Sequence, residues 1–196
     1  MPNRPSSEKE AKAWDFAKGK HEGQMRKFMD KSYFDAHVQK VNGIVKQYTT
    51  DEDILCASLL HDTLEDCYED KWEGYKEIRT LFGKNVADMV LEMTSDKNEI
   101  KHKFDGSKTQ YLMHKMINMS DDALILKLSD RLQNISDAFT AVEKFRNKYF
   151  QETSEIVEAL ESGRELNDIH QRLLDDIKSK LDNIGDIFKI KRFGEI

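Results

Sequence analysis

Hydrophobic residues recur every three or four positions along most of this chain, which is the spacing of an amphipathic helix. One such face runs through residues 32–48, where Phe34, Val38, Val41 and Val45 follow at helical intervals. No stretch shows a convincing alternation of apolar and polar residues, which is the pattern of a half-buried strand. The pattern therefore predicts an all-α protein, a bundle of roughly eight to ten helices.

Polar and glycine residues divide this pattern into successive helices. The first is expected to start at a capping box formed by Ser7 and Glu10 and to run to about Met29. Residues 96–107 are polar and predict a loop. The other predicted helices are 32–48, a helix from about Thr50 that carries residues 59–66, 71–82 before Gly83, 85–94, 109–117, 123–139, and a hairpin over about 142–183 broken near Gly163.

The length and composition fit one folded domain. A chain of 196 residues suits a single domain, for which we expect a flexible tail over residues 1–6 and one domain over 7–196. The helical hairpin is expected to pack on that domain. Only two prolines are present, both within the first five residues, which favours long helices. With 38% hydrophobic and 35% charged residues, the composition is that of a soluble globular protein.

The net charge and the cysteine content limit the partners and the cellular compartment that we expect for this protein. The formal net charge of −6 argues against nucleic acid as a partner. The two cysteines, Cys56 and Cys67, form no CxxC pair, so neither a zinc finger nor a structural disulfide is expected. The chain shows no signal-peptide pattern and no apolar run of membrane-spanning length. We therefore expect a cytoplasmic protein with no membrane partner, and the sequence leaves homo-oligomer formation open.

Residues 59–66, LLHDTLED, place ionisable side chains at the end of the most hydrophobic stretch. In a continuous helix, side chains four residues apart share a face, so His61 would lie over Glu65 and Asp62 over Asp66. Burying such charges costs several kcal/mol each unless something compensates. A bound metal ion would do so, and imidazole with carboxylate ligands suits manganese, iron or zinc. The alternative is an exposed acidic stripe on an amphipathic helix.

Two further polar residues interrupt apolar faces. Asp130 lies within the apolar helix around residues 127–134, and Asn134 follows it one turn later. Asp130 is either a metal ligand or the partner of a neighbour such as Arg131. His37 borders the apolar face of 32–48, and a single histidine in such a place is more often a satisfied core residue than a ligand.

Basic residues lie near the predicted end of the first helix. Arg26 and Lys27 end the segment HEGQMRK, and both could neutralise phosphate. The alternative is a solvated basic helix end, which the helix dipole favours. This stretch alone does not decide between the two.

The motifs together resemble the RelA/SpoT-homologue hydrolases of the HD-domain class, above all their small stand-alone metazoan form. The order His, His-Asp, Asp along the chain is the HD-domain metal signature. The matching segments are FAKGKHEGQMRK at 16–27, YFDAHV at 33–38, ASLLHDTLED at 57–66, FGKNVADMVLEMTSD at 82–96 and LILKLSDRLQNISD at 124–137.

The resemblance implies roles for specific residues. The metal ligands would be His37, His61, Asp62 and Asp130, holding Mn²⁺ or another divalent transition metal. Glu65 and Asp66 match the catalytic acidic pair. The residues that would contact the guanine nucleotide are Arg26, Lys27, Asn134, Asp137 and Tyr149. The chain departs from the family at Val38, where proline is usual, and at Asp137, where the long bacterial enzymes have threonine.

The implied activity is hydrolysis of the stringent-response nucleotide ppGpp. A metal-dependent enzyme of this kind removes the 3′-pyrophosphate and gives GDP and pyrophosphate. Since the chain ends at residue 196, no synthetase domain and no ppGpp synthesis are expected. Two alternatives stay open: an HD phosphohydrolase acting on another nucleotide, such as the 2′-phosphate of NADPH, and a catalytically inactive nucleotide sensor.

Overall fold

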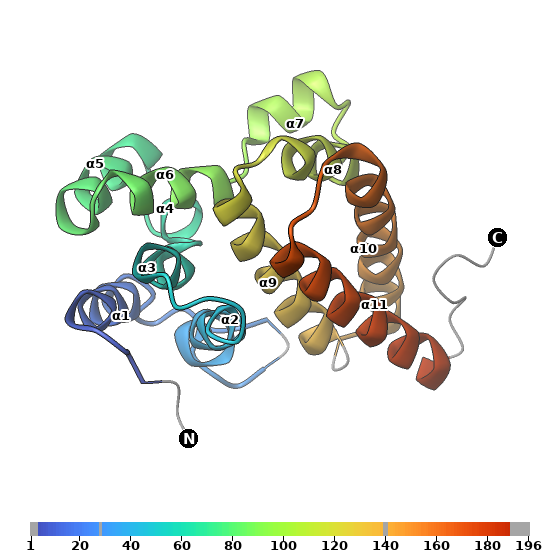
Figure 1. The fold of residues 1–196 in the computed structure, drawn as a ribbon, viewed down its shortest axis with the longest axis horizontal. Helices are drawn as coiled ribbons and strands as arrows, with labels where there is room; N and C mark the ends of the chain where they lie inside the picture. The colour runs from blue at the N-terminus through green and yellow to red at the C-terminus, as the bar shows by residue number, and fades with distance from the viewer. Residues whose placement is uncertain (1–3, 28, 139–140, 189–196) are drawn as a thin grey trace. The chain divides into compact units, whose positions relative to one another are not determined.

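The computed structural model describes residues 4–27, 29–138 and 141–188 (Figure 1). Within these ranges the regular secondary structure is helical, apart from one isolated antiparallel bridge between Met25 and Ser32. The prediction of an all-α protein is confirmed. None of the helices in these ranges combines the length and the apolar character needed to cross a membrane.

The chain divides into two compact units, with one helix contributing to both. The first unit comprises Met1–Ser95 and Ser120–Leu126, and the second comprises Asp96–Met119 and Lys127–Ile196. Helix α9 (Asp121–Ala138) therefore gives its first residues to the first unit and the rest to the second.

The first unit is organised around a buried central helix, α3. Its elements are α1 (Glu8–Lys20), the π-helical turn η1 (Phe34–Val38), α2 (Gln39–Val45), α3 (Glu52–Leu60), α4 (Thr63–Asp66), α5 (Lys71–Phe82) and α6 (Lys84–Met93). Helix α3 packs against α1, α2 and α6, as Figure 1 shows. Every residue from Ile54 to Leu60 is buried, as expected for a helix that is apolar on all sides.

The two cysteines of the first unit are shielded thiols. Cys56 is fully buried in α3, and burial raises the pKa of its thiol to about 12. Cys67, which follows α4, is partly buried, and burial raises its pKa to about 11. Both thiols are free and protonated at neutral pH, in agreement with the expectation that they form no disulfide.

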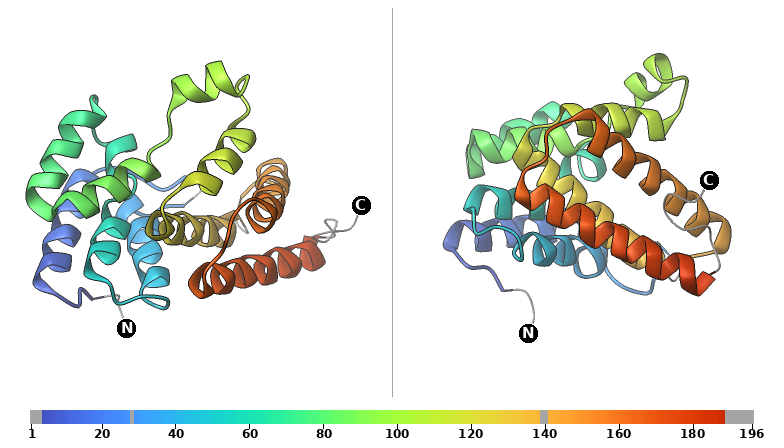
Figure 2. Two further views of the ribbon diagram at one scale, coloured as in Figure 1. Left: turned by 45° about the horizontal axis from the view of Figure 1, so that its top comes forward. Right: turned by 45° about the vertical axis from the view of Figure 1, so that its right-hand side comes forward.

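The second unit contains a helical hairpin. Its elements besides α9 are α7 (Lys97–Lys103), α8 (Lys108–Asn118), α10 (Glu143–Gly163) and α11 (Asp168–Phe188). Helices α10 and α11 run side by side in opposite directions (Figure 2), and α10 also packs on α8. The predicted hairpin and its break after Gly163 are confirmed. The next residue, Arg164, donates to the carbonyl oxygens of Met116 at 3.0 Å and Met119 at 2.9 Å, which satisfies the C-terminal end of α8.

Two predicted helices have different limits in the structure. The first helix ends at Lys20, not near Met29, because the chain turns at Gly23 with a φ of +78°. The helix predicted over 32–48 contains a π-helical turn, in which the N–H of Gln39 bonds to the carbonyl of Phe34 five residues earlier. Such turns are frequent at functional sites.

The helix predicted through LLHDTLED is interrupted, and a helix occupies part of the predicted loop. Helix α3 ends at Leu60 and α4 begins at Thr63, so the expected stacking of side chains four residues apart is wrong. In the region expected to be a loop, Asp96 accepts hydrogen bonds from the backbone N–H groups of Asn98 and Glu99. This N-cap starts α7 in a segment that is otherwise polar.

A buried carboxylate anchors the start of α1. Glu10 is fully buried and accepts hydrogen bonds from the backbone and hydroxyl of Ser6 at 2.6 and 2.7 Å and from Asn42 at 3.1 Å. Lys46 completes the site with an ion pair at 2.8 Å. Burial alone would raise the pKa of Glu10, but these bonds outweigh it and the pKa lies below its ordinary value. Of the expected tail, residues 1–3 lie outside the described chain, and Ser6 is bound to this carboxylate.

Gly74 leaves no room for a side chain where α5 packs on α4. A Cβ atom there would lie 2.6 Å from Cδ2 of Leu64 and 2.7 Å from Cδ2 of Tyr68. We expect Gly74→Ala to lower the free energy of unfolding by about 1–2 kcal/mol, because overpacking exceeds the gain in helix propensity. The matched control is Gly19→Ala in α1, where nothing lies within 4 Å of the new Cβ and no loss is expected. Urea denaturation of both variants tests this, and equal midpoints would contradict it.

Candidate metal centre

Three predicted metal ligands converge in the first unit. One ligand atom from each of His37, His61 and Asp62 lies within 4.8 Å of the other two. Nε2 of His61 is 3.0 Å, and Nε2 of His37 is 3.4 Å, from Oδ2 of Asp62. The two Nε2 atoms are 3.3 Å apart. Two imidazole nitrogens and one carboxylate oxygen around a common point form a donor set that suits a divalent transition metal.

A backbone carbonyl fixes the orientation of His61. Its Nδ1 lies 2.8 Å from the carbonyl oxygen of Ser58, which can only accept a hydrogen bond. Nδ1 therefore carries a proton, and Nε2 is the nitrogen that faces His37 and Asp62. This is the usual arrangement of a metal-binding histidine, whose second nitrogen is held by a hydrogen bond.

Asp62 is ionised in this setting. Burial alone would raise its pKa, but charge on His61 and hydrogen bonds from His37 and His61 hold the pKa well below its ordinary value. Both histidine side chains are buried, while the Asp62 side chain is 22% exposed, so the group is reached from the Asp62 side. A ligand carboxylate must be deprotonated, and Asp62 meets that requirement.

The break between α3 and α4 allows two consecutive residues, His61 and Asp62, to point toward the same centre. In a regular α-helix, consecutive side chains point roughly 100° apart. Here His61 and Asp62 lie between two helices, with φ and ψ of −100° and −5° at Asp62, and both point to one centre. The buried helix α3 leads directly into His61, and η1 supplies His37 from a separate segment.

Glu65 and Asp66 are exposed on α4, so the expectation that they are buried is wrong. One oxygen of Glu65 accepts a hydrogen bond from the backbone N–H of Ser95 at 2.9 Å. One oxygen of Asp66 accepts from the side chain of Gln24 at 3.1 Å. Neither acid belongs to the three-ligand group, and each carboxylate is oriented by a neutral donor.

Arg26 and Lys27 lie in the non-helical segment after Gly23, so the explanation as a basic helix end is wrong. The backbone N–H of Arg26 bonds to the carbonyl of Lys31 at 3.0 Å, which holds the backbone of Arg26 in place. The Arg26 guanidinium lies 5.4 Å from the ring centre of Tyr33. Lys27 is exposed.

The remaining predicted site residues belong to the second unit, where Asp130 and Asn134 are in contact. One Asp130 oxygen accepts from the Asn134 amide at 2.6 Å, and the other lies 3.3 Å from Nζ of Lys127. Arg131, which the sequence offered as a partner for Asp130, forms an ion pair with Glu152 at 3.0 Å. It also interacts electrostatically with the Asp130 carboxylate.

Tyr149 joins this polar group from α10. Its ring centre is 4.8 Å from the Arg131 guanidinium, and its hydroxyl is hydrogen-bonded to Asn134. Burial raises the pKa of Tyr149 above its ordinary value, so the hydroxyl stays protonated. Asp137 accepts a hydrogen bond from Gln133 at 2.8 Å along α9. The second unit therefore brings together Asp130, Asn134 and Tyr149, and their approach to the three-ligand group stays a prediction.

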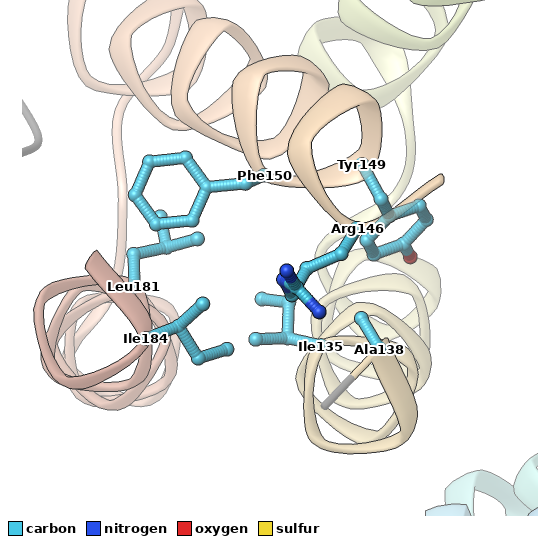
Figure 3. Close-up of a pocket in the computed structure, with 7 residues that line it drawn as sticks. All are labelled: Ile135, Ala138, Arg146, Tyr149, Phe150, Leu181 and Ile184. Carbon is cyan, nitrogen blue, oxygen red and sulfur yellow. The ribbon is translucent and has the colours of Figure 1, made fainter. Parts of the chain in front are cut away.

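Figure 3 shows the apolar side of Tyr149 at a small cavity between α9, α10 and α11. The Tyr149 oxygen points away from Leu181 and Ile184, whereas Phe150 points toward them. The cavity has a volume of about 10 Å³, enough for at most one water molecule. It therefore belongs to the packing of the hairpin, and the polar end of Tyr149 belongs to the Asp130 group.

Comparison with known proteins places these residues in a family. The model of the HD domain family matches residues 13–165. This chain is an HD-domain protein. The matched segment contains the three converging ligands and also Asp130, and the HD domain takes in residues of both compact units.

Two relatives match this HD domain over most of their own length. A guanosine-3′,5′-bis(diphosphate) 3′-pyrophosphohydrolase of Xenopus tropicalis is 33% identical over 155 residues, covering 76% of this chain and 82% of the relative. The enzyme of the same name from Drosophila melanogaster is 30% identical over 152 residues, covering 74% and 80%. The resemblance predicted from the motifs is thereby confirmed.

A longer relative and a solved structure complete the comparison. The guanosine-3′,5′-bis(diphosphate) 3′-pyrophosphohydrolase of Aquifex aeolicus is 33% identical over 145 residues, covering 74% of this chain but only 20% of the relative. One solved structure superposes with a TM-score of 0.72 at 26% identity, covering 96% of this chain and 99% of the other. It is the structure of a metazoan ortholog of SpoT that is described as hydrolyzing ppGpp and playing a role in starvation responses.

The HD domain also contains polar residues that sequence reasoning missed. Tyr33 donates a hydrogen bond to Oδ2 of Asp62 at 2.5 Å, and the Ser58 carbonyl orients His61. His21 lies beside Tyr33, with 5.1 Å between ring centres. The signal for Tyr33 was its position four residues before His37, and a backbone carbonyl such as that of Ser58 leaves no sequence signal.

Proposed function

We propose that this HD domain is a metal-dependent ppGpp hydrolase that removes the 3′-pyrophosphate to give GDP and pyrophosphate. One observation carries the proposal: the nitrogens of His37 and His61 converge with Asp62 on one centre. Relatives named for this reaction match the same chain over most of their length. In the reaction, the oxygen of water bonds to the phosphorus attached to the ribose 3′ oxygen, the bond to that oxygen breaks, and the 3′ oxygen takes up a proton.

The proposed cofactor is Mn²⁺, with Asp130 as the fourth ligand. The three-donor group fits such an ion because both imidazoles present Nε2 and Asp62 is ionised. When bound, a divalent ion lowers the pKa of water and stabilises negative charge on phosphorus. The role of Asp130 rests on the family resemblance, and its carboxylate already accepts bonds from Asn134 and Lys127.

Glu65 and Asp66 are proposed to handle the protons. Glu65 is exposed, lies outside the ligand group, and is oriented through one oxygen by Ser95. A carboxylate held in this way can orient water or accept its proton. Asp66, held by Gln24, is the proposed second acid of the pair.

Positive side chains are needed to bind the substrate. The net charge of −6 would repel a nucleotide that carries two diphosphates, so local cations must offset it. We assign this role to Arg26 and Lys27. Asn134, Asp137 and Tyr149 are the proposed contacts to the nucleoside, on the strength of the family resemblance. The free thiols Cys56 and Cys67 support a cytoplasmic setting.

The test measures pyrophosphate and phosphate release from ppGpp with and without Mn²⁺, beside NADPH and simple nucleotides. We expect Mn²⁺-dependent release of pyrophosphate from ppGpp, with GDP as the second product. If NADPH were hydrolysed and ppGpp were not, the proposed metal-dependent mechanism would stand, but the substrate would be NADPH and not ppGpp. Loss of all activity in a protein that binds Mn²⁺ and ppGpp would favour a nucleotide sensor.

A further inference from the structure

Tyr33 lies between the candidate metal centre and the loop that carries Arg26. Its hydroxyl donates to Oδ2 of Asp62 at 2.5 Å. That oxygen is the one that faces Nε2 of both His37 and His61. The hydroxyl therefore holds the carboxylate oxygen that belongs to the ligand group, and the bond to an ionised acceptor is of the strong, charge-assisted kind.

The ring of Tyr33 contacts three other polar residues of the first unit. Its centre lies 5.2 Å from the His37 ring, 5.1 Å from the His21 ring and 5.4 Å from the Arg26 guanidinium. An arginine at this distance from an aromatic face is attracted by the ring quadrupole. One side chain thus orients a candidate metal ligand by its hydroxyl and a candidate phosphate-binding residue by its ring.

The backbone around Tyr33 ties the same elements together. Its N–H donates to the carbonyl of Gln24 at 2.8 Å, and the side chain of Gln24 reaches Asp66. Next to this hydrogen-bonded pair, Met25, which follows Gln24, and Ser32, which precedes Tyr33, form an antiparallel bridge. Immediately after Tyr33, the π-helical turn η1 begins and carries His37. The position of Tyr33 is therefore fixed from both sides.

We propose that Tyr33 is a positioning residue of the active site, which orients Asp62 for metal binding and couples the metal centre to the Arg26 loop. The proposal rests on the metal centre assigned above, but not on the identity of the substrate. Outer partners of metal ligands typically account for about 10–100-fold in metal affinity or activity. The two parts of the proposal can be tested separately, because the Tyr33 hydroxyl bonds to Asp62 and the Tyr33 ring contacts Arg26.

The first experiment removes only the hydroxyl. Tyr33→Phe is expected to weaken Mn²⁺ binding to the metal-free protein by about 10-fold or more, as measured by isothermal calorimetry. The matched control is Tyr75→Phe, which removes a similar bond to an aspartate, from Tyr75 to Asp88 at 2.7 Å, elsewhere in the first unit. We expect the control to bind Mn²⁺ like the unaltered protein. Equal Mn²⁺ affinity in all three proteins would overturn the role assigned to the hydroxyl.

The second experiment also removes the ring. Tyr33→Leu should lose Mn²⁺ affinity as Tyr33→Phe does, and should in addition raise KM for ppGpp several-fold because Arg26 loses its contact. A purely structural role would lower thermal stability in both variants without changing Mn²⁺ affinity or separating their KM values. If the unaltered protein binds Mn²⁺ but does not cleave ppGpp, the proposed substrate fails, and the calorimetry still decides the role of Tyr33.

Discussion

Replacing His61 with alanine is expected to abolish Mn²⁺ binding and to reduce ppGpp hydrolysis to background. His61 contributes the Nε2 that lies 3.0 Å from Asp62 and 3.3 Å from His37, so its loss leaves only two of the three converging donors. Without the ion, water keeps its ordinary pKa and the charge that develops on phosphorus is not offset. Bound manganese per chain, measured by elemental analysis, and kcat would both report the loss.

A buried side chain is removed in this variant, so folding must be checked separately. His61→Gln keeps more of the side-chain volume and should lose the metal in the same way, while its circular dichroism stays that of a folded helical protein. His102→Ala, an exposed histidine on α7, serves as the control and should keep full metal content and rate. A His61→Ala protein that retains one Mn²⁺ per chain would show that the centre has been assigned to the wrong residues.

Replacing Glu65 with glutamine is expected to leave the metal in place and to lower kcat by about 10²–10⁴-fold, the usual contribution of a general acid or base. Glutamine keeps an oxygen that can accept the hydrogen bond from Ser95. The change therefore removes the charge and basicity of the side chain while preserving its position. Steady-state kinetics together with manganese content would separate the two effects.

The control for Glu65 is an acid of the same segment without a proposed role. Glu69 is exposed and follows α4, so Glu69→Gln should change neither the metal content nor the rate. Two results would contradict the assignment of Glu65 to proton handling. One is a metal-free Glu65→Gln protein, which would make Glu65 a ligand, and the other is an unchanged kcat.

The periodicity of apolar residues predicted the helical class and most of the helices, because the buried face of each helix appears in the sequence as apolar residues three or four positions apart. It failed where a few backbone angles decide the outcome. Gly23 ends the first helix early through its positive φ, and Asp96 starts a helix within polar residues by a local cap. Each of these effects depends on a single residue. Helical periodicity is judged over a window of many residues, so one residue changes it little.

The candidate site shows a similar division. The residue types of His37, His61 and Asp62 pointed to a metal, and the structure brings these three together. The expected geometry, with side chains stacked four apart on one helix, was wrong, since the helix breaks between Leu60 and Thr63. Spacing rules assume a continuous helix, so they cannot anticipate a break that lets two neighbouring residues face one centre.

The buried thiol of Cys56 lies in the helix that leads into His61 and Asp62, so it can serve as a natural reporter of local opening. Cys56 lies five residues before His61, fully buried and protonated, so a thiol reagent reaches it only when α3 opens. An ion that binds the closed form alone lowers the open population by mass action. The rate at which Cys56 is labelled should therefore fall as metal is added. That decrease would measure how much metal binding stabilises α3, without any label engineered into the chain.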